Sequence, residues 1–156
     1  MNTVKSGGAG LYDRVFAAVL ARSTPVHVFF YRALRGRVVD RASNGFMPLL
    51  LLTTIGRRTG RPRTVALGHI NDGHDLVVIG SNGGLDAAPA WTTNLRSRPN
   101  AEVQLGERTF AVRADFPEGA ERERLWDQVA SRYPFFHGYQ KRTRRRLAVV
   151  RLRPAS

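Results

Sequence analysis

Residues 49–70 read LLLLTTIGRRTGRPRTVALGHI. The four leucines are typical of a buried strand, and the alternation that follows from Thr64 to Ile70 is typical of a half-buried one. We therefore predict strands at 47–54 and 64–70, joined by a tight loop. The rest of the chain is organised around this pair.

The loop between these strands has the composition of an anion-binding site. It holds two glycines and four arginines, namely Gly56, Gly60, Arg57, Arg58, Arg61 and Arg63. Glycine lets backbone amides approach a phosphate or carboxylate, and arginine supplies a planar, permanently charged donor. The loop is not a P-loop, because it lacks the Lys-Ser/Thr pair and the following helix. A solvated basic hairpin is the alternative, but crowded arginines repel one another unless an anion joins them, which favours a ligand.

Composition limits the classes of protein to which the chain can belong. At 156 residues, 42% of them hydrophobic, it is long enough for one domain with a substantial core. It has no cysteine, which excludes a disulfide framework, a thiolate nucleophile and a Cys-ligated metal site, and which fits a cytoplasmic protein. The net charge of +13 implies attraction to nucleic acid, anionic lipid or an anionic small ligand. No stretch approaches the roughly 18 apolar residues of a membrane-spanning helix.

The N-terminal region divides into a flexible tail at 1–10 and two expected helices within 11–42. The second helix, at about 26–34, carries aromatic residues, and arginines lie at its end and beyond. These helices could form a substrate cover or rest peripherally on the inner face of an anionic membrane. The alternative, which we favour, is that the aromatic residues pack on the sheet and the arginines face water.

The remaining pattern predicts four more strands and two more helices. Strands are expected at 75–80, 101–105, 108–116 and 147–152, and helices at 86–98, with Asp86 as its cap, and at 117–133. His69 and His74 are not accompanied by other residues at the spacing of metal ligands, so no metal site is predicted. Hairpin connections between most strands favour an antiparallel barrel with flanking helices over a doubly wound sheet. The expected class is α+β, mainly β, with the barrel domain spanning 46–153.

Several motifs in this order resemble the deazaflavin-dependent nitroreductase family. They are the loop at 53–63, Ser81-Asn82-Gly83-Gly84, PAWTTNL at 89–95, Tyr133-Pro134, Tyr139-Gln140 and VVRL at 149–152. The resemblance implies a split β-barrel of the FMN-binding type that uses reduced coenzyme F420 as a hydride donor. The implied acceptor is an apolar, electrophilic small molecule of the quinone, enone or nitroaromatic class.

The resemblance also implies a set of site residues. Tyr139 is the first choice for the group that donates a hydrogen bond or proton to the acceptor, followed by Tyr133 and Ser81. Arg57, Arg58, Gly60 and Arg63 would hold the anionic cofactor tail. The full cofactor-binding set is Thr54, Gly56, Arg57, Arg58, Thr59, Gly60, Pro62, Arg63, Ser81, Asn82, Gly83, Pro89, Trp91 and Asn94. For Trp91 an ordinary core position is an equal alternative.

The chain departs from the family pattern at three positions. Phe136 stands where relatives often have a tyrosine, Asn82 where some have a lysine, and Arg144 where an acidic residue is common. A phenylalanine cannot donate a hydrogen bond, so either the acceptor differs or Tyr139 acts alone.

Other functions remain as alternatives. The same barrel could use FMN, or could carry a cofactor or lipid without turnover. The basic run at 141–146 could contact nucleic acid, but no nucleic-acid-binding motif accompanies it, so this alternative is the weaker one. Split barrels commonly pair, which makes a homodimer a further hypothesis.

Overall fold

The computed structural model describes residues 47–156. The predicted tail at 1–10, the predicted helices at 11–42 and their proposed membrane contact lie outside the described residues. No helix within 47–156 combines the length and apolar character needed to span a bilayer.

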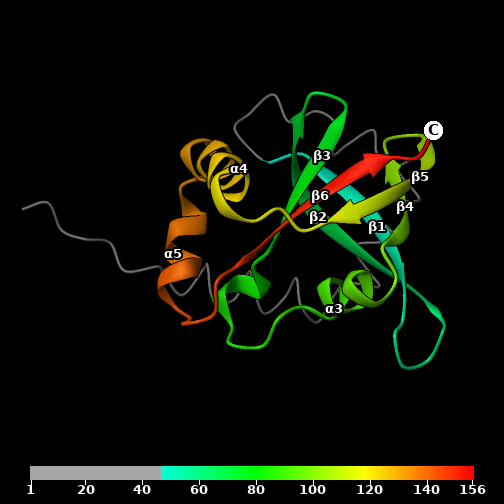
Figure 1. Ribbon diagram of the computed structural model, residues 1–156, viewed down its shortest axis with the longest axis horizontal. Coiled ribbons are helices and arrows are strands. Elements are labelled where there is room, and N and C mark those ends of the chain that lie inside the picture. The colour runs from blue at the N-terminus through cyan, green and yellow to red at the C-terminus, as the bar shows by residue number, and fades with distance from the viewer. Residues whose placement is uncertain (1–46) are drawn as a thin grey trace, which may run out of the picture.

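Six antiparallel strands form a closed barrel with neighbours in the order β1-β2-β3-β6-β5-β4, and β4 returns to β1 (Figure 1). The strands are β1 (Leu49–Ile55), β2 (Pro62–Asp72), β3 (Asp75–Gly80), β4 (Asn100–Leu105), β5 (Arg108–Asp115) and β6 (Ala148–Pro154). The helices are η1 (Asn82–Gly84), α3 (Ala90–Ser97), α4 (Gly119–Arg132) and α5 (Phe135–Lys141). The predicted mainly β class and flanked antiparallel barrel are confirmed.

The strand register brings three connections, β1–β2, β3–β4 and β5–β6, to one end of the barrel. Ile55 pairs with Pro62 where β1 meets β2, and Gly80 pairs with Ala148 where β3 ends and β6 begins. Because all neighbouring strands are antiparallel, the carboxyl ends of β1, β3 and β5 lie with the amino ends of β2, β4 and β6. The arginine-rich loop, the segment after β3, helix α3 and the α5–β6 connection therefore share this end. The β2–β3 and β4–β5 turns occupy the other.

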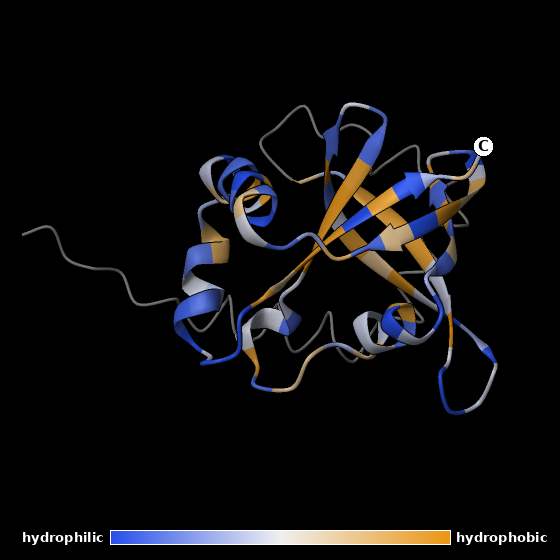
Figure 2. Cartoon of the chain, viewed as in Figure 1, coloured by the Kyte–Doolittle hydropathy of each residue, from blue (hydrophilic) through white to orange (hydrophobic). Residues whose placement is uncertain are grey.

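Strand alternation separates two cores. Leu76 and Val78 face the barrel interior, whereas Val77 and Ile79 face outward toward the helices. Figure 2 shows the corresponding hydrophobic colouring along the strands. The interior cluster includes Leu50, Leu52, Trp91, Leu95, Val103, Val112, Val150 and Leu152. The outer cluster includes Leu125, Trp126, Val129, Tyr133, Phe136, Leu147 and Val149.

Two helical segments differ from the sequence prediction. The helix expected at 86–98 begins only at Ala90, because Pro89 adopts an extended conformation with ψ 141°. Asp86 is therefore not its cap, and its carboxylate instead accepts a hydrogen bond from Thr143 Oγ1 at 2.8 Å. Helix α5 was not predicted from the sequence. Its seven residues include Gly138 and are too few to show a helical repeat.

Candidate active site

The arginine-rich loop has a backbone fixed by its own hydrogen bonds. Gly56 N donates to Arg61 O at 2.8 Å, and Gly60 N donates to Gly56 O at 2.8 Å. Gly60 has a φ of +68°, which side-chain-bearing residues rarely adopt. A Cβ added at Gly56 would lie 2.7 Å from Thr59 Oγ1, which is too close for an ordinary contact. Both glycines are thus required by the local geometry.

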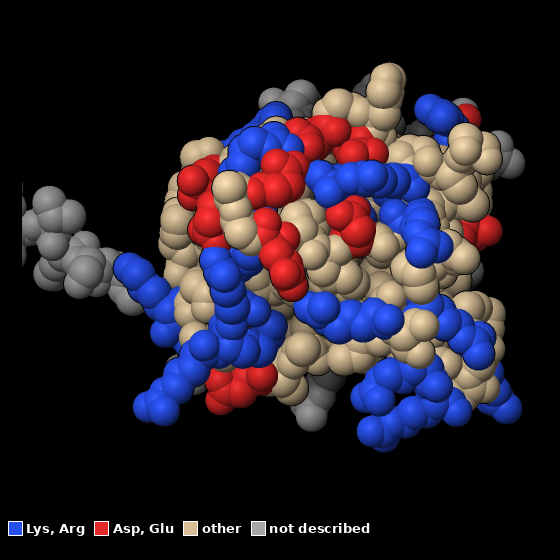
Figure 3. Space-filling view, in the orientation of Figure 1, with Lys and Arg blue, Asp and Glu red and all other residues tan. Residues whose placement is uncertain are grey.

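All four arginine side chains of this loop are exposed, as are Thr59, Gly60 and Pro62. Within residues 47–156, neither a salt bridge nor a side-chain hydrogen bond engages the guanidinium groups of Arg57, Arg58, Arg61 or Arg63. Figure 3 shows basic side chains gathered on the projecting loop, with no acidic ones among them. The loop therefore presents concentrated positive charge on a defined backbone.

Asn94 of α3 ties this loop to the barrel. Its Oδ1 accepts a hydrogen bond from the Arg57 backbone N–H at 3.1 Å, and its Nδ2 donates to Thr54 Oγ1 at 3.0 Å. Thr54 is fully buried and Asn94 is 5% exposed. The Asn94 amide and the Thr54 hydroxyl are thus hydrogen-bonded within the protein. These bonds position the loop against the barrel. Sequence reasoning placed both residues at the site but did not find this bridge.

The segment after β3 forms a tight corner at the same end of the barrel. Asn82, Gly83 and Gly84 all have positive φ, at 45°, 63° and 81°. Gly84 N donates to Ser81 O at 2.8 Å, and Asn82 Nδ2 donates to Ala87 O at 3.0 Å. The structure places Ser81, Asn82 and Gly83 together in this corner, where all three are half-buried.

The predicted proton donors lie in different surroundings. Tyr133 is 7% exposed and belongs to the outer core, as does Phe136 at 5%. Tyr139 is half-buried, and its ring packs edge-on against Phe136 with centroids 6.0 Å apart. A Cβ at Gly84 would lie 2.6 Å from Tyr139 O, so α5 directly abuts the corner. The backbone of Tyr139 therefore lies against Gly84 of this corner, while its ring packs on Phe135 and Phe136.

Pro89 lies just before α3, and Trp91 lies within it. Pro89 precedes the first helical residue, and the Trp91 ring is 5% exposed within the barrel core. The structure therefore assigns Trp91 the core position that the sequence left as an alternative. Through Asn94, the buried side of this helix supports the loop.

The basic run at 141–146 is largely used within the protein. Arg142 Nη1 donates to Gly83 O at 3.3 Å, Arg145 contacts three backbone carbonyls, and Arg146 pairs with Glu123. The sequence shows that the run is basic but does not reveal these partners, which lie 23 to 65 residues away. Internal use of these side chains weakens the nucleic-acid alternative.

A family model described as F420H(2)-dependent quinone reductase matches residues 23–154. The chain belongs to this family. The F420H(2)-dependent quinone reductase Rv1261c of Mycobacterium tuberculosis is 37% identical over 131 residues, which cover 80% of this chain and 85% of that protein. The resemblance inferred from the sequence motifs is thus confirmed.

Solved structures support the same assignment of this quinone reductase family member. The F420-H2 dependent reductase FDR-A is 31% identical, with a TM-score of 0.62 over 67% of this chain and 93% of its own. A second relative, described as a domain-swapped dimer, is 29% identical, with a TM-score of 0.64 over 81% of this chain and 96% of its own. The predictions of an oxidoreductase and of coenzyme F420 as its cofactor are confirmed by family membership.

Proposed function

We propose that this member of the F420H(2)-dependent quinone reductase family binds the anionic tail of coenzyme F420 on the arginine loop and reduces a quinone at the adjoining corner. The observation that carries the proposal is the set of exposed loop arginines, which have no acidic partner within residues 47–156. Four guanidinium groups on a backbone fixed by hydrogen bonds suit a tail that bears a phosphate and several carboxylates.

The donor chemistry of the site fits this cofactor. Each charge-assisted hydrogen bond from an arginine contributes on the order of 1.5–3 kcal/mol. The backbone amides of Gly56, Arg57, Gly60 and Arg61 already have acceptors within the protein, so the guanidinium groups are the main donors that the loop offers to an anion. Arg57, Arg58 and Arg63 would hold the tail, while Thr59 and Pro62 would shape the loop. Ser81, Asn82 and Gly83 would contact the phosphate and ring portions.

Reduced coenzyme F420, when bound, supplies a hydride. The protein's part is to align the quinone, exclude water and donate a hydrogen bond to the quinone oxygen on which negative charge develops. We assign this donation first to Tyr139, whose helix α5 abuts the corner through its backbone, and next to Ser81. Tyr133, whose ring packs in the outer core, is the third choice. Hydride and one proton together convert the quinone to the hydroquinone.

The proposal is tested by fluorescence titration with reduced and oxidised coenzyme F420, with FMN and a nicotinamide cofactor as comparisons. We expect a clear preference for the deazaflavin. Arg63→Ala should weaken its binding at least roughly tenfold, which corresponds to about 1.4 kcal/mol.

Arg108→Ala is the matched control, because Arg108 is also exposed but lies at the opposite end of the barrel. Equal affinity of Arg63→Ala and the wild type would contradict the assignment of the tail to this loop. Preferential binding of FMN would favour the alternative cofactor.

The sequence also raised two possible partners other than the cofactor and substrate, namely a second copy of the chain and a membrane surface. The domain-swapped relative supports a homodimer for this chain as well. Contact with a membrane, the less favoured interpretation of residues 11–42, concerns a part of the chain outside the described residues and stays a hypothesis.

A further inference from the structure

The side chain of Arg145 donates hydrogen bonds to the backbone of residues 80–85, at the end of β3 and just after it. Its Nε donates to Leu85 O at 2.8 Å, its Nη1 to Gly80 O at 2.9 Å and its Nη2 to Ser81 O at 2.7 Å. Burial lowers the pKa of this guanidinium, and the charge of Asp86 opposes that effect. A partly buried arginine thus directs all three of its nitrogens at a single stretch of backbone.

Residues 80–85 pack tightly against α3 at Gly80 and against α5 at Gly84. A Cβ at Gly80 would lie 2.7 Å from Thr92 Cγ2 of α3, and one at Gly84 would lie 2.6 Å from Tyr139 O of α5. Asn82, Gly83 and Gly84 are three consecutive residues with positive φ, and the first of them is not a glycine. Such a conformation is intrinsically unfavourable for asparagine compared with an extended one, so surrounding contacts must hold it.

The hydrogen bond to Ser81 O also fixes the next amide. In a trans peptide the N–H points opposite to the carbonyl, and no cis peptide occurs in 47–156. Because Ser81 O is turned toward Arg145, the Asn82 N–H is turned away from it. Neither that N–H nor the Gly83 N–H has a hydrogen-bond acceptor among the described residues. Successive backbone N–H groups in αR and αL conformations form a concavity that suits anions, and Ser81 is αR while Asn82 has a positive φ.

We propose that Arg145 is a positioning residue that orients the Ser81–Asn82 peptide so that the Asn82 and Gly83 amides face an anionic oxygen of the bound cofactor. The inference rests on the proposed function, since it concerns the same cofactor. Arg145 acts through the backbone and does not itself touch the ligand. The planar guanidinium matters here more than the positive charge, because a lysine ammonium is one point charge on a flexible stem and lacks three separate nitrogens to direct at the three carbonyls.

The test compares Arg145→Met and Arg145→Lys with Arg144→Met as the matched control, because Arg144 is exposed and adjacent. Affinity for reduced coenzyme F420 is measured by fluorescence titration, and the Asn82 and Gly83 amides are followed by ¹⁵N–¹H NMR. We expect Arg145→Met to weaken binding roughly tenfold or more, and Arg145→Lys to resemble it rather than the wild type. In the wild type and the control, cofactor should shift both amide resonances. In the Arg145 variants these shifts should be lost.

A merely structural role for Arg145 would lower the melting temperature without changing the amide response to cofactor. That result, or wild-type affinity in a folded Arg145→Lys variant, would overturn the inference. If Arg145→Met does not fold, the lysine variant alone decides between the two outcomes. Failure of the wild type to bind coenzyme F420 would overturn the proposed function and this inference together. Normal binding by the wild type and by both Arg145 variants would overturn only the inference.

Discussion

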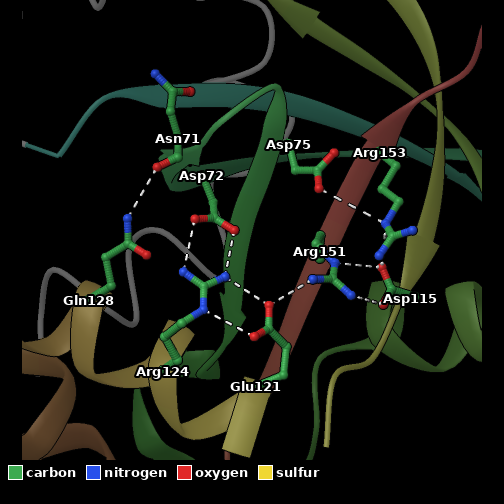
Figure 4. Close-up of polar contacts among 9 residues, drawn as sticks. All are labelled: Asn71, Asp72, Asp75, Asp115, Glu121, Arg124, Gln128, Arg151 and Arg153. Carbon is green, nitrogen blue, oxygen red and sulfur yellow. Dashed lines mark hydrogen bonds and ion pairs between the residues drawn. The ribbon is translucent and has the colours of Figure 1, made fainter.

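Two groups of arginines on this small barrel have opposite surroundings. On the face formed by β3, β6 and α4, Arg124, Arg151 and Arg153 alternate with acidic side chains (Figure 4). Arg124 contacts both Asp72 and Glu121, and Arg151 contacts both Asp115 and Glu121. In the β1–β2 loop, Arg57, Arg58, Arg61 and Arg63 have no such partners among residues 47–156.

The difference indicates two uses of the same side chain. Neutralised arginines join elements that are distant in sequence, as Arg151 joins β6 to the carboxylates of β5 and α4. Arginines without counter-charges do not stabilise the fold by pairing, and they repel one another across a short distance. An enzyme that binds a polyanion gains from such an arrangement, because the ligand supplies the missing charge.

The bridge by Asn94 allows the strongest test of this comparison, since it joins the unpaired group to the core. Asn94→Ala should lower the free energy of unfolding by about 1–3 kcal/mol, because the buried Thr54 hydroxyl and the Arg57 N–H lose their partner. It should also weaken coenzyme F420 binding roughly tenfold, because the loop loses its anchor. Urea unfolding and fluorescence titration measure the two effects.

Thr93→Ala is the control on the same helix, because among residues 47–156 Thr93 Oγ1 bonds only to Ala90 O, one turn earlier. A destabilised Asn94→Ala protein with unchanged cofactor affinity would show that the loop does not need this anchor.

Replacing a paired arginine should lower stability and leave the affinity for coenzyme F420 unchanged. Arg151→Met should lower the free energy of unfolding by about 1–2 kcal/mol, because it removes two ion pairs from a side chain that is 13% exposed. Cofactor affinity should not change. Arg153→Met, at 55% exposure and with longer contacts, should cost less than about 0.5 kcal/mol. A loss of cofactor affinity in Arg151→Met would contradict the idea that only the unpaired loop arginines serve cofactor binding.

Acid should produce the smallest effect, confined to the paired group. The hydrogen bond from Arg124 holds the pKa of Asp72 and of Glu121 below their ordinary values. A lowered folded-state pKa means that these carboxylates stabilise the fold above their ordinary pKa, and that this contribution is lost as the pH falls through the lowered values. Unfolding free energy, measured between neutral and acid pH, should therefore decline at the acid end.

Arg124→Gln should reduce that acid decline, because both carboxylates lose the partner that lowers their pKa most, although Arg151 still acts on them. The same pH dependence in the variant and the wild type would assign the decline to other groups.

Local pattern was sufficient to predict most of the barrel. Alternation, Gly-containing turns and the leucine run identify all six strands within a few residues of their observed ends. Helix α5 was missed because seven residues containing Gly138 carry no clear period. The start of α3 was misplaced because Asp86, a good cap by type, is instead held by Thr143.

The candidate site was predictable in composition but not in its internal support. Gly56 and Gly60 and the four arginines are visible as a motif, and their exposure follows from their position in a loop. The roles of Asn94 and Arg145 depend on contacts 37 to 65 residues apart in sequence. Such contacts follow from the closure of the barrel, and one sequence without its fold does not reveal them.

Barrel closure also constrains how two copies of this chain can associate. Every strand has neighbours on both sides, so a second molecule cannot extend the sheet by adding a strand to an open edge. The seam between β1 and β4 has the shortest register, running only from Leu51–Gln104 to Thr53–Glu102. Among residues 47–156, self-association through the sheet would therefore require a strand to be exchanged, and the β1–β4 seam is where the least backbone pairing has to be broken for such an exchange.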